Sequence, residues 1–258
     1  MSTHPFIDPQ RPRARIKPLT AMSRMKRLIA DKEDTEQVFH IIEALNGRMT
    51  QQNLIQFASA PKGAKRLAER RYLPPFLDDH DWIRALPEGT VGRAYVDFME
   101  REGLTAQGLV EESEKFRSKL SAFDDDLTWF INRQRDTHDL FHVLSGYGRD
   151  ALGEASLLAF SHGQNPSRGI LFIAFMASRE LQKVLPRQAD VMACYREGKR
   201  NGAAASRIVE EDILALLKEP LQAARERLGI AKPVAYRQAL KVCADAGIGA
   251  HDINPAAA

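Results

Sequence analysis

The 258-residue chain has few cysteines and no long apolar run, and both absences exclude classes of protein. Its two cysteines, Cys194 and Cys243, lie far apart, so they indicate neither a disulfide framework nor a cysteine pair with metal-ligand spacing. The longest uninterrupted apolar run covers only residues 170–177, whereas a membrane-spanning helix needs about 20 such residues. The first residues also lack the apolar centre of a secretory signal. We therefore expect a protein of a reducing compartment that does not cross a bilayer.

Strand patterns are also scarce, because alternation of apolar and polar residues at period two never persists. Apolar residues recur instead at helical spacings of three and four, as at Val38, Ile41 and Leu45. The sequence predicts an all-α fold, a single-domain helical bundle with a metal-binding helical hairpin. We expect a basic, flexible N-terminal arm over residues 1–30, the all-α domain over 31–231 and a loosely ordered C-terminal tail over 232–258.

Excess positive charge is confined to the first 30 residues. The formal net charge is +3, but residues 1–30 hold seven cations and one anion, which leaves +6 there and −3 for the rest of the chain. Such an arm is either a solvated tail or a segment attracted to an anionic membrane or to nucleic acid. No aromatic residues alternate with the cations, so we expect no nucleic-acid partner.

A dense group of titratable residues occurs in the stretch HDLFHVLSGYGRDALGE. The pattern predicts a helix over residues 125–144, on which His138 and His142 are four residues apart and share one face. Asp139 lies about 100° from His138 and about 60° from His142 around that helix. Two imidazoles and a carboxylate that converge in this way form a normal ligand set for zinc, iron(II) or manganese.

Glu154 supplies a fourth candidate ligand only if the chain reverses its direction. On one continuous helix it would stand roughly 18 Å from His142. Gly146 and Gly148 are expected to end the first helix and to allow a second helix, starting near residue 150, to fold back. The stretch therefore predicts a helical hairpin that binds a metal through His138, Asp139, His142 and Glu154. Arg149 is expected to pair with a carboxylate beside this site.

Three other interpretations remain open at this point. Histidines four residues apart are often surface residues or satisfied core residues, and the sequence H-D-x-x-H also resembles the metal-binding helix of a soluble metallohydrolase. A phosphohydrolase would need further isolated ligands. The remaining candidates, His40, His80 and His162, lack a convincing acidic pattern, although three aspartates surround His80.

At these residues the sequence resembles the Coq-four family of ubiquinone (coenzyme Q) biosynthesis proteins. The family signature, H-D-x-x-H followed by eleven residues and E, is matched in full by the four candidate ligands. Residues 86–95 are similar to the family's L-P-x-x-T-x-G-x-x-Y segment, and residues 220–230 are similar to its closing helix. The resemblance covers roughly residues 35–230, so the arm and the tail fall outside it.

The resemblance implies a ubiquinone biosynthesis protein that binds a prenylated aromatic intermediate and one divalent metal ion. Zinc is our first expectation, with iron(II), manganese and magnesium as alternatives. The family suggests two roles: oxidative decarboxylation at ring C1, which replaces a carboxyl group by a hydroxyl, or organisation of a biosynthetic enzyme complex without catalysis. We favour the enzyme, with Asp139 and Glu154 as candidate catalytic residues, because two histidines and a carboxylate also form the facial arrangement of non-haem iron oxygenases.

The expected partners are the prenylated precursor, other ubiquinone-biosynthesis enzymes, a membrane surface and a second copy of the chain in a homodimer. We expect a cytoplasmic protein, peripheral on the inner face of a bacterial cell membrane, or on the matrix side of a mitochondrial membrane in a eukaryote. Met22, Met25, Leu28 and Ile29 are candidates for contact with that surface. Apolar residues after the motif form either ordinary core or the lining of a prenyl tunnel: Leu157, Leu158, Phe160, Ile170, Leu171, Phe172, Ile173, Phe175 and Met176.

Overall fold

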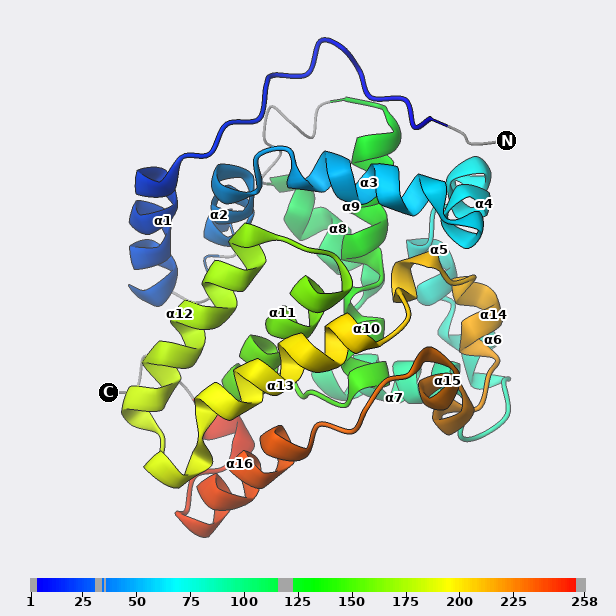
Figure 1. The fold of residues 1–258 in the computed structure, drawn as a ribbon. Helices are drawn as coiled ribbons and strands as arrows, with labels where there is room; N and C mark the ends of the chain where they lie inside the picture. Colours follow the sequence, from blue (N-terminus) through cyan, green and yellow to red (C-terminus); the bar gives the residue numbers. More distant parts are fainter. Residues whose placement is uncertain (1–3, 31–33, 35, 116–122, 254–258) are drawn as a thin grey trace. The chain divides into compact units, whose positions relative to one another are not determined.

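The computed structural model describes residues 4–30, 34, 36–115 and 123–253, and its regular elements in those ranges are helices (Figure 1). Within the same ranges, the only β-type backbone pairing is an isolated bridge between Thr90 and Pro220. The predicted all-α fold class is confirmed. No described helix is both long enough and apolar enough to cross a membrane.

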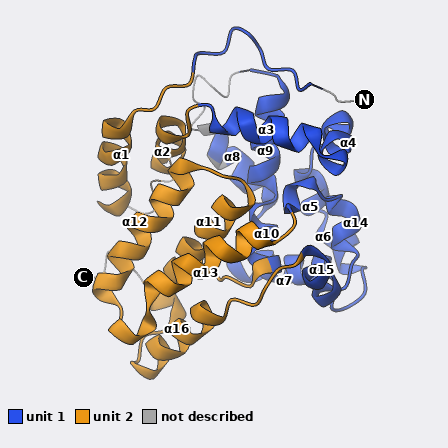
Figure 2. Ribbon diagram, viewed as in Figure 1, with its two compact units in different colours: residues 1–13, 48–144, 207–228 blue, residues 14–47, 145–206, 229–258 orange. Residues whose placement is uncertain are grey.

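The chain divides into two compact units, each built from three separate segments (Figure 2). Unit 1 comprises residues 1–13, 48–144 and 207–228, and unit 2 comprises residues 14–47, 145–206 and 229–258. The sequence predicted one domain over 31–231 flanked by an arm and a tail. Both flanking segments instead contribute described structure to these units.

Unit 1 holds α10 (His138–Ser145), the helix that carries both histidines of the motif. In chain order its elements are α3 (Met49–Ser59), α4 (Pro61–Glu69), α5 (Pro74–Leu77), α6 (His80–Arg84), α7 (Val91–Glu102), α8 (Ala106–Lys115), α9 (Asp126–Asp136), α10 (His138–Ser145), η2 (Ile208–Glu210), α14 (Ile213–Leu217) and α15 (Leu221–Leu228). The last residue of α10 lies at the boundary between the units.

A buried arginine joins two of the segments of unit 1. Arg133 of α9 donates 2.7 Å hydrogen bonds to the carbonyl oxygens of Val209 and Glu211. Burial lowers the pKa of Arg133 to about 10, and the nearby cation Arg66 acts in the same direction. The guanidinium thus supplies hydrogen-bond donors to two backbone carbonyls outside the regular α-helices. These bonds hold residues 207–211 against α9.

The first residues of the chain are also anchored within unit 1. Arg11 is buried and pairs with Asp125, whose carboxylate caps α9. The amide of Phe6 donates to Asp126, and the Phe6 carbonyl accepts from the Asp126 amide. Part of the predicted basic arm therefore lies along the start of α9.

Unit 2 contains the long apolar helices. Its elements are α1 (Pro18–Ala30), α2 (Glu36–Asn46), α11 (Ala151–Gln164), α12 (Arg168–Val184), η1 (Arg187–Ala189), α13 (Val191–Ala204), α16 (Val234–Asp245) and η3 (Ala250–Asp252). A core cluster joins α1, α2 and α12 through Ala21, Met25, Ile41, Ala44 and Ile173. The second half of the predicted arm is therefore a packed helix.

Glycines allow α11 and α13 to pack closely. A Cβ atom added at Gly202 would lie 2.0 Å from the Phe160 carbonyl oxygen, and one added at Gly198 would lie 2.3 Å from the Ser156 carbonyl oxygen. The pair Asn201–Gly202 is typical of a turn, yet α13 continues through it to Ala204. Gly202 therefore allows close packing of α13 against α11 and does not reverse the chain.

Residues expected to form a loose tail contain α16. Tyr236, Ala239 and Cys243 of this helix are buried at spacings of three and four. Glu197 of α13 accepts hydrogen bonds from the amides of Ala235 and Tyr236, two donors in the first turn of α16 that lack a partner within the helix. The partner that stabilises this helix therefore lies nearly 40 residues away in the sequence.

Candidate metal centre

The first histidine of the motif lies at the start of a short helix that follows a break. Thr137 separates α9 from α10, and α10 begins at His138. The Thr137 hydroxyl donates a 2.9 Å hydrogen bond to the Arg133 carbonyl, a back-bond that commonly bends helices. The continuous helix predicted over 125–144 is therefore wrong at Thr137, although its predicted start is confirmed by the capping carboxylate of Asp125.

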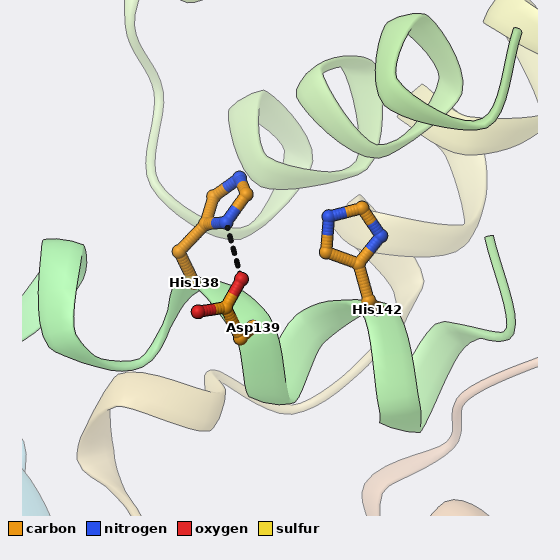
Figure 3. Close-up of side chains that lie close together, drawn as sticks. All are labelled: His138, Asp139 and His142. Atoms are coloured by element: carbon orange, nitrogen blue, oxygen red, sulfur yellow. Dashed lines mark hydrogen bonds and ion pairs between the residues drawn. The ribbon is translucent and has the colours of Figure 1, made fainter. Parts of the chain in front are cut away.

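His138, Asp139 and His142 gather on one side of α10 (Figure 3). One ligand atom from each lies within 4.8 Å of the corresponding atoms of the other two. His138 Nδ1 is 3.4 Å from Asp139 Oδ1. Tetrahedral ligands at about 2.1 Å from a zinc ion are roughly 3.4 Å apart. The donor set and its spacing therefore fit a divalent cation after a modest contraction.

The three side chains differ in their access to solvent. The Asp139 side chain is 12% exposed and the His138 side chain is 33% exposed, whereas His142 is buried. The two imidazole rings meet edge to face, with centroids 5.2 Å apart and an interplanar angle of 76°. The cluster is thus closed around His142 and open beside His138.

Two side chains from other helices of unit 1 contact the second half of α10. Phe98 of α7 stacks on the His142 ring, with centroids 5.2 Å apart and planes inclined by 24°. Arg225 of α15 donates 2.9 Å hydrogen bonds to the carbonyl oxygens of Val143 and Leu144. A cation at this position satisfies carbonyls that lack partners within the last turn of the helix.

Carboxylates surround a buried tyrosine near the cluster. Burial is the largest cause that raises the pKa of Tyr95, and the charges of Asp139, Asp78 and Asp136 raise it further. Arg135 donates two hydrogen bonds to Asp136 and partly offsets that charge. The surplus of carboxylates around α7 and α10 favours a bound cation.

Glu154, the fourth predicted ligand, lies in the first turn of α11 and belongs to unit 2. Its side chain is 34% exposed, and its Oε1 lies 3.7 Å from Arg149 Nε, so the predicted pairing of Arg149 with a carboxylate is confirmed. The structure groups the other three residues within unit 1. The role of Glu154 as a ligand stays a prediction.

The glycine-containing turn before Glu154 is confirmed as a break between helices. Gly146 has φ 79°, a left-handed conformation that glycine adopts without strain, and α11 begins only at Ala151. The Tyr236 hydroxyl accepts a 3.1 Å hydrogen bond from the Gly148 amide and donates to the carboxylate of Asp150, which caps α11. Sequence reasoning missed Tyr236 because it lies in the expected tail.

The other histidines make separate contacts. His40 pairs with Glu36, His80 lies 3.5 Å from Glu100, and His162 bonds to the Ser167 carbonyl. In the described part of the chain, the only group of three or more potential ligands is formed by His138, Asp139 and His142. The arrangement therefore gives no support to a phosphohydrolase site built on several helices.

The candidate tunnel residues divide into two sets. Leu157, Phe160 and Ile173 are fully buried, and the half-buried residues Leu158, Phe172 and Met176 pack on the core cluster of unit 2. Phe175 is exposed and contacts Tyr195, and Ile170 and Leu171 are half-buried. Most of these residues thus form ordinary core, while one side of α12 presents apolar surface.

Comparisons with known proteins identify relatives of this helical chain. Residues 16–234 match the family described as Coenzyme Q (ubiquinone) biosynthesis protein Coq4. The "Ubiquinone biosynthesis protein COQ4, mitochondrial" of Ajellomyces capsulatus is 27% identical over 187 residues, which are 71% of this chain and 63% of that protein. The mitochondrial coq4 protein of Botryotinia fuckeliana is 27% identical over 181 residues, or 69% and 61% of the two chains. The chain spans about three fifths of the length of these relatives.

A solved structure shows the same fold. The crystal structure of a Nostoc punctiforme protein with a provisional ubiquinone-biosynthesis name matches with a TM-score of 0.62 and 23% identity, over 84% of this chain and 100% of the other. Fold and site thus define a helical protein with a candidate His–Asp–His metal centre. The chain belongs to the Coq4 family of coenzyme Q biosynthesis proteins, as the motif residues indicated, because the family match covers most of its length.

Proposed function

We propose that the chain acts in ubiquinone biosynthesis as a metal-dependent enzyme that exchanges the ring C1 carboxyl group of a prenylated aromatic intermediate for a hydroxyl group. Family membership supports the pathway. The convergence of His138, Asp139 and His142 carries the assignment of an enzyme, because this donor set suits an exchangeable metal better than a closed structural site rich in cysteine. Zinc, iron(II) and manganese suit these ligands, whereas magnesium prefers oxygen ligands alone.

The exchange is an oxidation, so it requires an oxidant. The bond between ring C1 and the carboxyl carbon breaks, carbon dioxide leaves, and a bond from C1 to oxygen forms. With dioxygen as oxidant, one oxygen atom enters the product, and the other leaves as water after uptake of two electrons and two protons from a reductant. A bound metal would supply a Lewis-acidic or redox-active centre for this chemistry.

The protein residues have separate tasks in this proposal. His138 is the partly exposed member of the cluster, so the substrate head group approaches on that side. Asp139 lies 3.4 Å from His138 Nδ1 and can orient that ring or exchange a proton with it. Glu154 is proposed as the further ligand or proton carrier. The apolar side of α12, with Leu171 and Phe175, is proposed to contact the prenyl chain.

A non-catalytic organiser of a ubiquinone-biosynthesis complex is the second candidate, because a bound metal can also stabilise a fold without taking part in catalysis. A soluble metallohydrolase has less support. The described part of the chain offers no sheet edge to which a peptide substrate could add as a strand.

A cellular experiment separates the enzyme from the organiser. Cells that carry Asp139→Asn or Glu154→Gln should accumulate a prenylated intermediate that retains its carboxyl group. A head-group analogue with a hydroxyl already at C1 should restore ubiquinone in these cells. If rescue fails while the variant protein is present at normal levels, the organiser is favoured.

We also propose that the protein lies peripherally on an anionic membrane and contacts it through α1. Leu19, Met22 and Ile29 are 85%, 44% and 38% exposed, and they fall within about 80° around the helix. Lys26 is exposed between them, and α1 contains no acidic residue. Met25, predicted to face the membrane, is instead buried in the core.

The proposed location follows from this face and from the relatives. It is the inner face of a bacterial cell membrane, or the matrix side of a mitochondrial membrane, since both curated relatives carry mitochondrial names. Other ubiquinone-biosynthesis enzymes and a second copy of the chain are the proposed protein partners. Sedimentation of the purified protein tests the homodimer.

A further inference from the structure

We infer that Phe98 is a positioning residue for the candidate metal centre, because it fixes the plane of the His142 ring. The inference rests on the proposed metal site. A bond between an imidazole nitrogen and a metal lies in the plane of the ring, so the orientation of that plane decides where the ligand points. His142 is the most buried of the three candidate ligands, and it is also the ring that Phe98 covers.

The stacking geometry restricts the motion of His142. The rings of Phe98 and His142 have centroids 5.2 Å apart and planes inclined by only 24°, the offset arrangement that aromatic pairs prefer. Rotation of the imidazole about its bond to Cβ would drive one edge into the phenyl ring. The ring is therefore limited to one plane, and only a half-turn, which exchanges each nitrogen position with a carbon position, leaves that plane unchanged.

The ring plane in which Phe98 holds His142 suits a metal ion shared with His138. The His138 ring meets His142 at 76°, so the two imidazoles do not stack on each other and both can direct a nitrogen toward one point. Without the phenyl ring, His142 could lean away from this arrangement, which would separate the two donors. Phe98 meets the cluster at the His142 ring, so we assign its action to His142.

Phe98 is itself held in place on a fixed helix. The Arg101 guanidinium, one turn later on α7, lies 5.5 Å from the centre of the Phe98 ring. The start of α7 is joined to the segment just before α15 by a 2.9 Å hydrogen bond from the Val91 amide to the Glu219 carbonyl. Arg225 of α15 in turn holds the last carbonyls of α10. The segment from 219 to 225 therefore ties together the helices that carry Phe98 and His142.

The test uses zinc and cobalt(II) titrations of the full purified chain. Phe98→Leu keeps an apolar side chain but removes the flat ring, and Phe98→Tyr keeps the ring. Phe130→Leu is the matched control, because Phe130 is a fully buried phenylalanine of unit 1 that contacts Phe57 instead of the cluster. Removing a group that orients a metal ligand typically weakens binding 10- to 100-fold.

We expect Phe98→Leu to weaken zinc binding at least 10-fold and to alter the visible spectrum of bound cobalt. Phe98→Tyr and Phe130→Leu should bind zinc as the wild type does. Equal affinity of Phe98→Leu and wild type, or equal weakening by Phe130→Leu, would overturn the inference. If Phe98→Leu does not fold, Phe98→Met provides the same comparison with a larger apolar side chain.

Failure of the proposed metal site has a different signature. In that case the wild type binds no stoichiometric metal, or His142→Ala retains it, and the positioning role of Phe98 falls with the site. When wild type binds metal and His142→Ala does not, only the comparison among the Phe98 variants decides the inference.

Discussion

The ion pair between Arg11 and Asp125 leads to a quantitative prediction about acid stability. Arg11 Nε lies 2.6 Å from Asp125 Oδ2, and a second guanidinium nitrogen lies 2.6 Å from Oδ1. Burial by itself would raise the pKa of Asp125, but the hydrogen bonds from Arg11 and from the amides of Asp8 and Thr128 outweigh it and lower this pKa to about 2. The buried carboxyl group of Asp125 therefore stays ionised at low pH only while these donors stay in place.

The sign of the pH dependence follows from this lowered pKa. Folded Asp125 binds a proton more weakly than unfolded Asp125, so its stabilisation is complete above the unfolded pKa near 3.8 and is lost as the pH falls toward 2. The difference between 3.8 and about 2, at 1.36 kcal/mol per unit, corresponds to roughly 2.5 kcal/mol of unfolding free energy.

Urea unfolding of wild type and Arg11→Gln tests this reasoning. At pH 7 the substitution should cost about 2–4 kcal/mol, since it leaves a buried carboxylate with fewer donors. Between pH 4 and pH 2, the variant should lose less further stability than the wild type does. Arg13→Gln removes the same charge from an exposed position two residues away and should change stability by less than about 0.5 kcal/mol. Equal acid sensitivity of wild type and Arg11→Gln would refute the account.

Three further outcomes are expected. His142→Ala should abolish stoichiometric zinc in the purified protein while far-ultraviolet circular dichroism stays unchanged; full metal content would place the site elsewhere. Gly202→Ala should lower the free energy of unfolding, measured by urea denaturation, by about 1–3 kcal/mol, despite the better helix propensity of alanine, because its Cβ would meet the Phe160 carbonyl at 2.0 Å. An unchanged midpoint contradicts this contact. Leu19→Gln combined with Met22→Gln should reduce flotation with anionic liposomes, and equal flotation of variant and wild type would exclude this face of α1 as the membrane contact.

Sequence patterns predicted the features of this protein that depend on neighbours in the chain. Helical spacing indicated the all-α class, and the helix predicted to start at residue 125 does begin there, with Asp125 as its cap. The interruption at Gly146 followed from the freedom of glycine at positive φ. Since His138, Asp139 and His142 lie within five residues, local helix geometry was sufficient to predict that they converge.

Tertiary contacts decided the features that local patterns described wrongly or missed. Gly202 continues a helix because α11 packs against it, and residues 234–245 form α16 because Glu197 and a buried interface stabilise them. Without these distant partners, Gly202 would favour a turn, and residues 234–245 would favour an irregular tail. Helix propensities amount to less than about 1 kcal/mol per residue, so burial and hydrogen bonds from distant segments can override them.

The candidate site shows the same division. The sequence alone determined the candidate donor groups and their spacing, because these depend on which side chains are present and on the helical repeat. Only the tertiary structure placed Phe98 on the His142 ring and Arg225 on the carbonyls at the end of α10. These residues lie more than 40 and more than 80 positions from His142, and no local periodicity relates them to it. Side-chain orientation at a site depends on packing between segments, and packing is set by the fold as a whole.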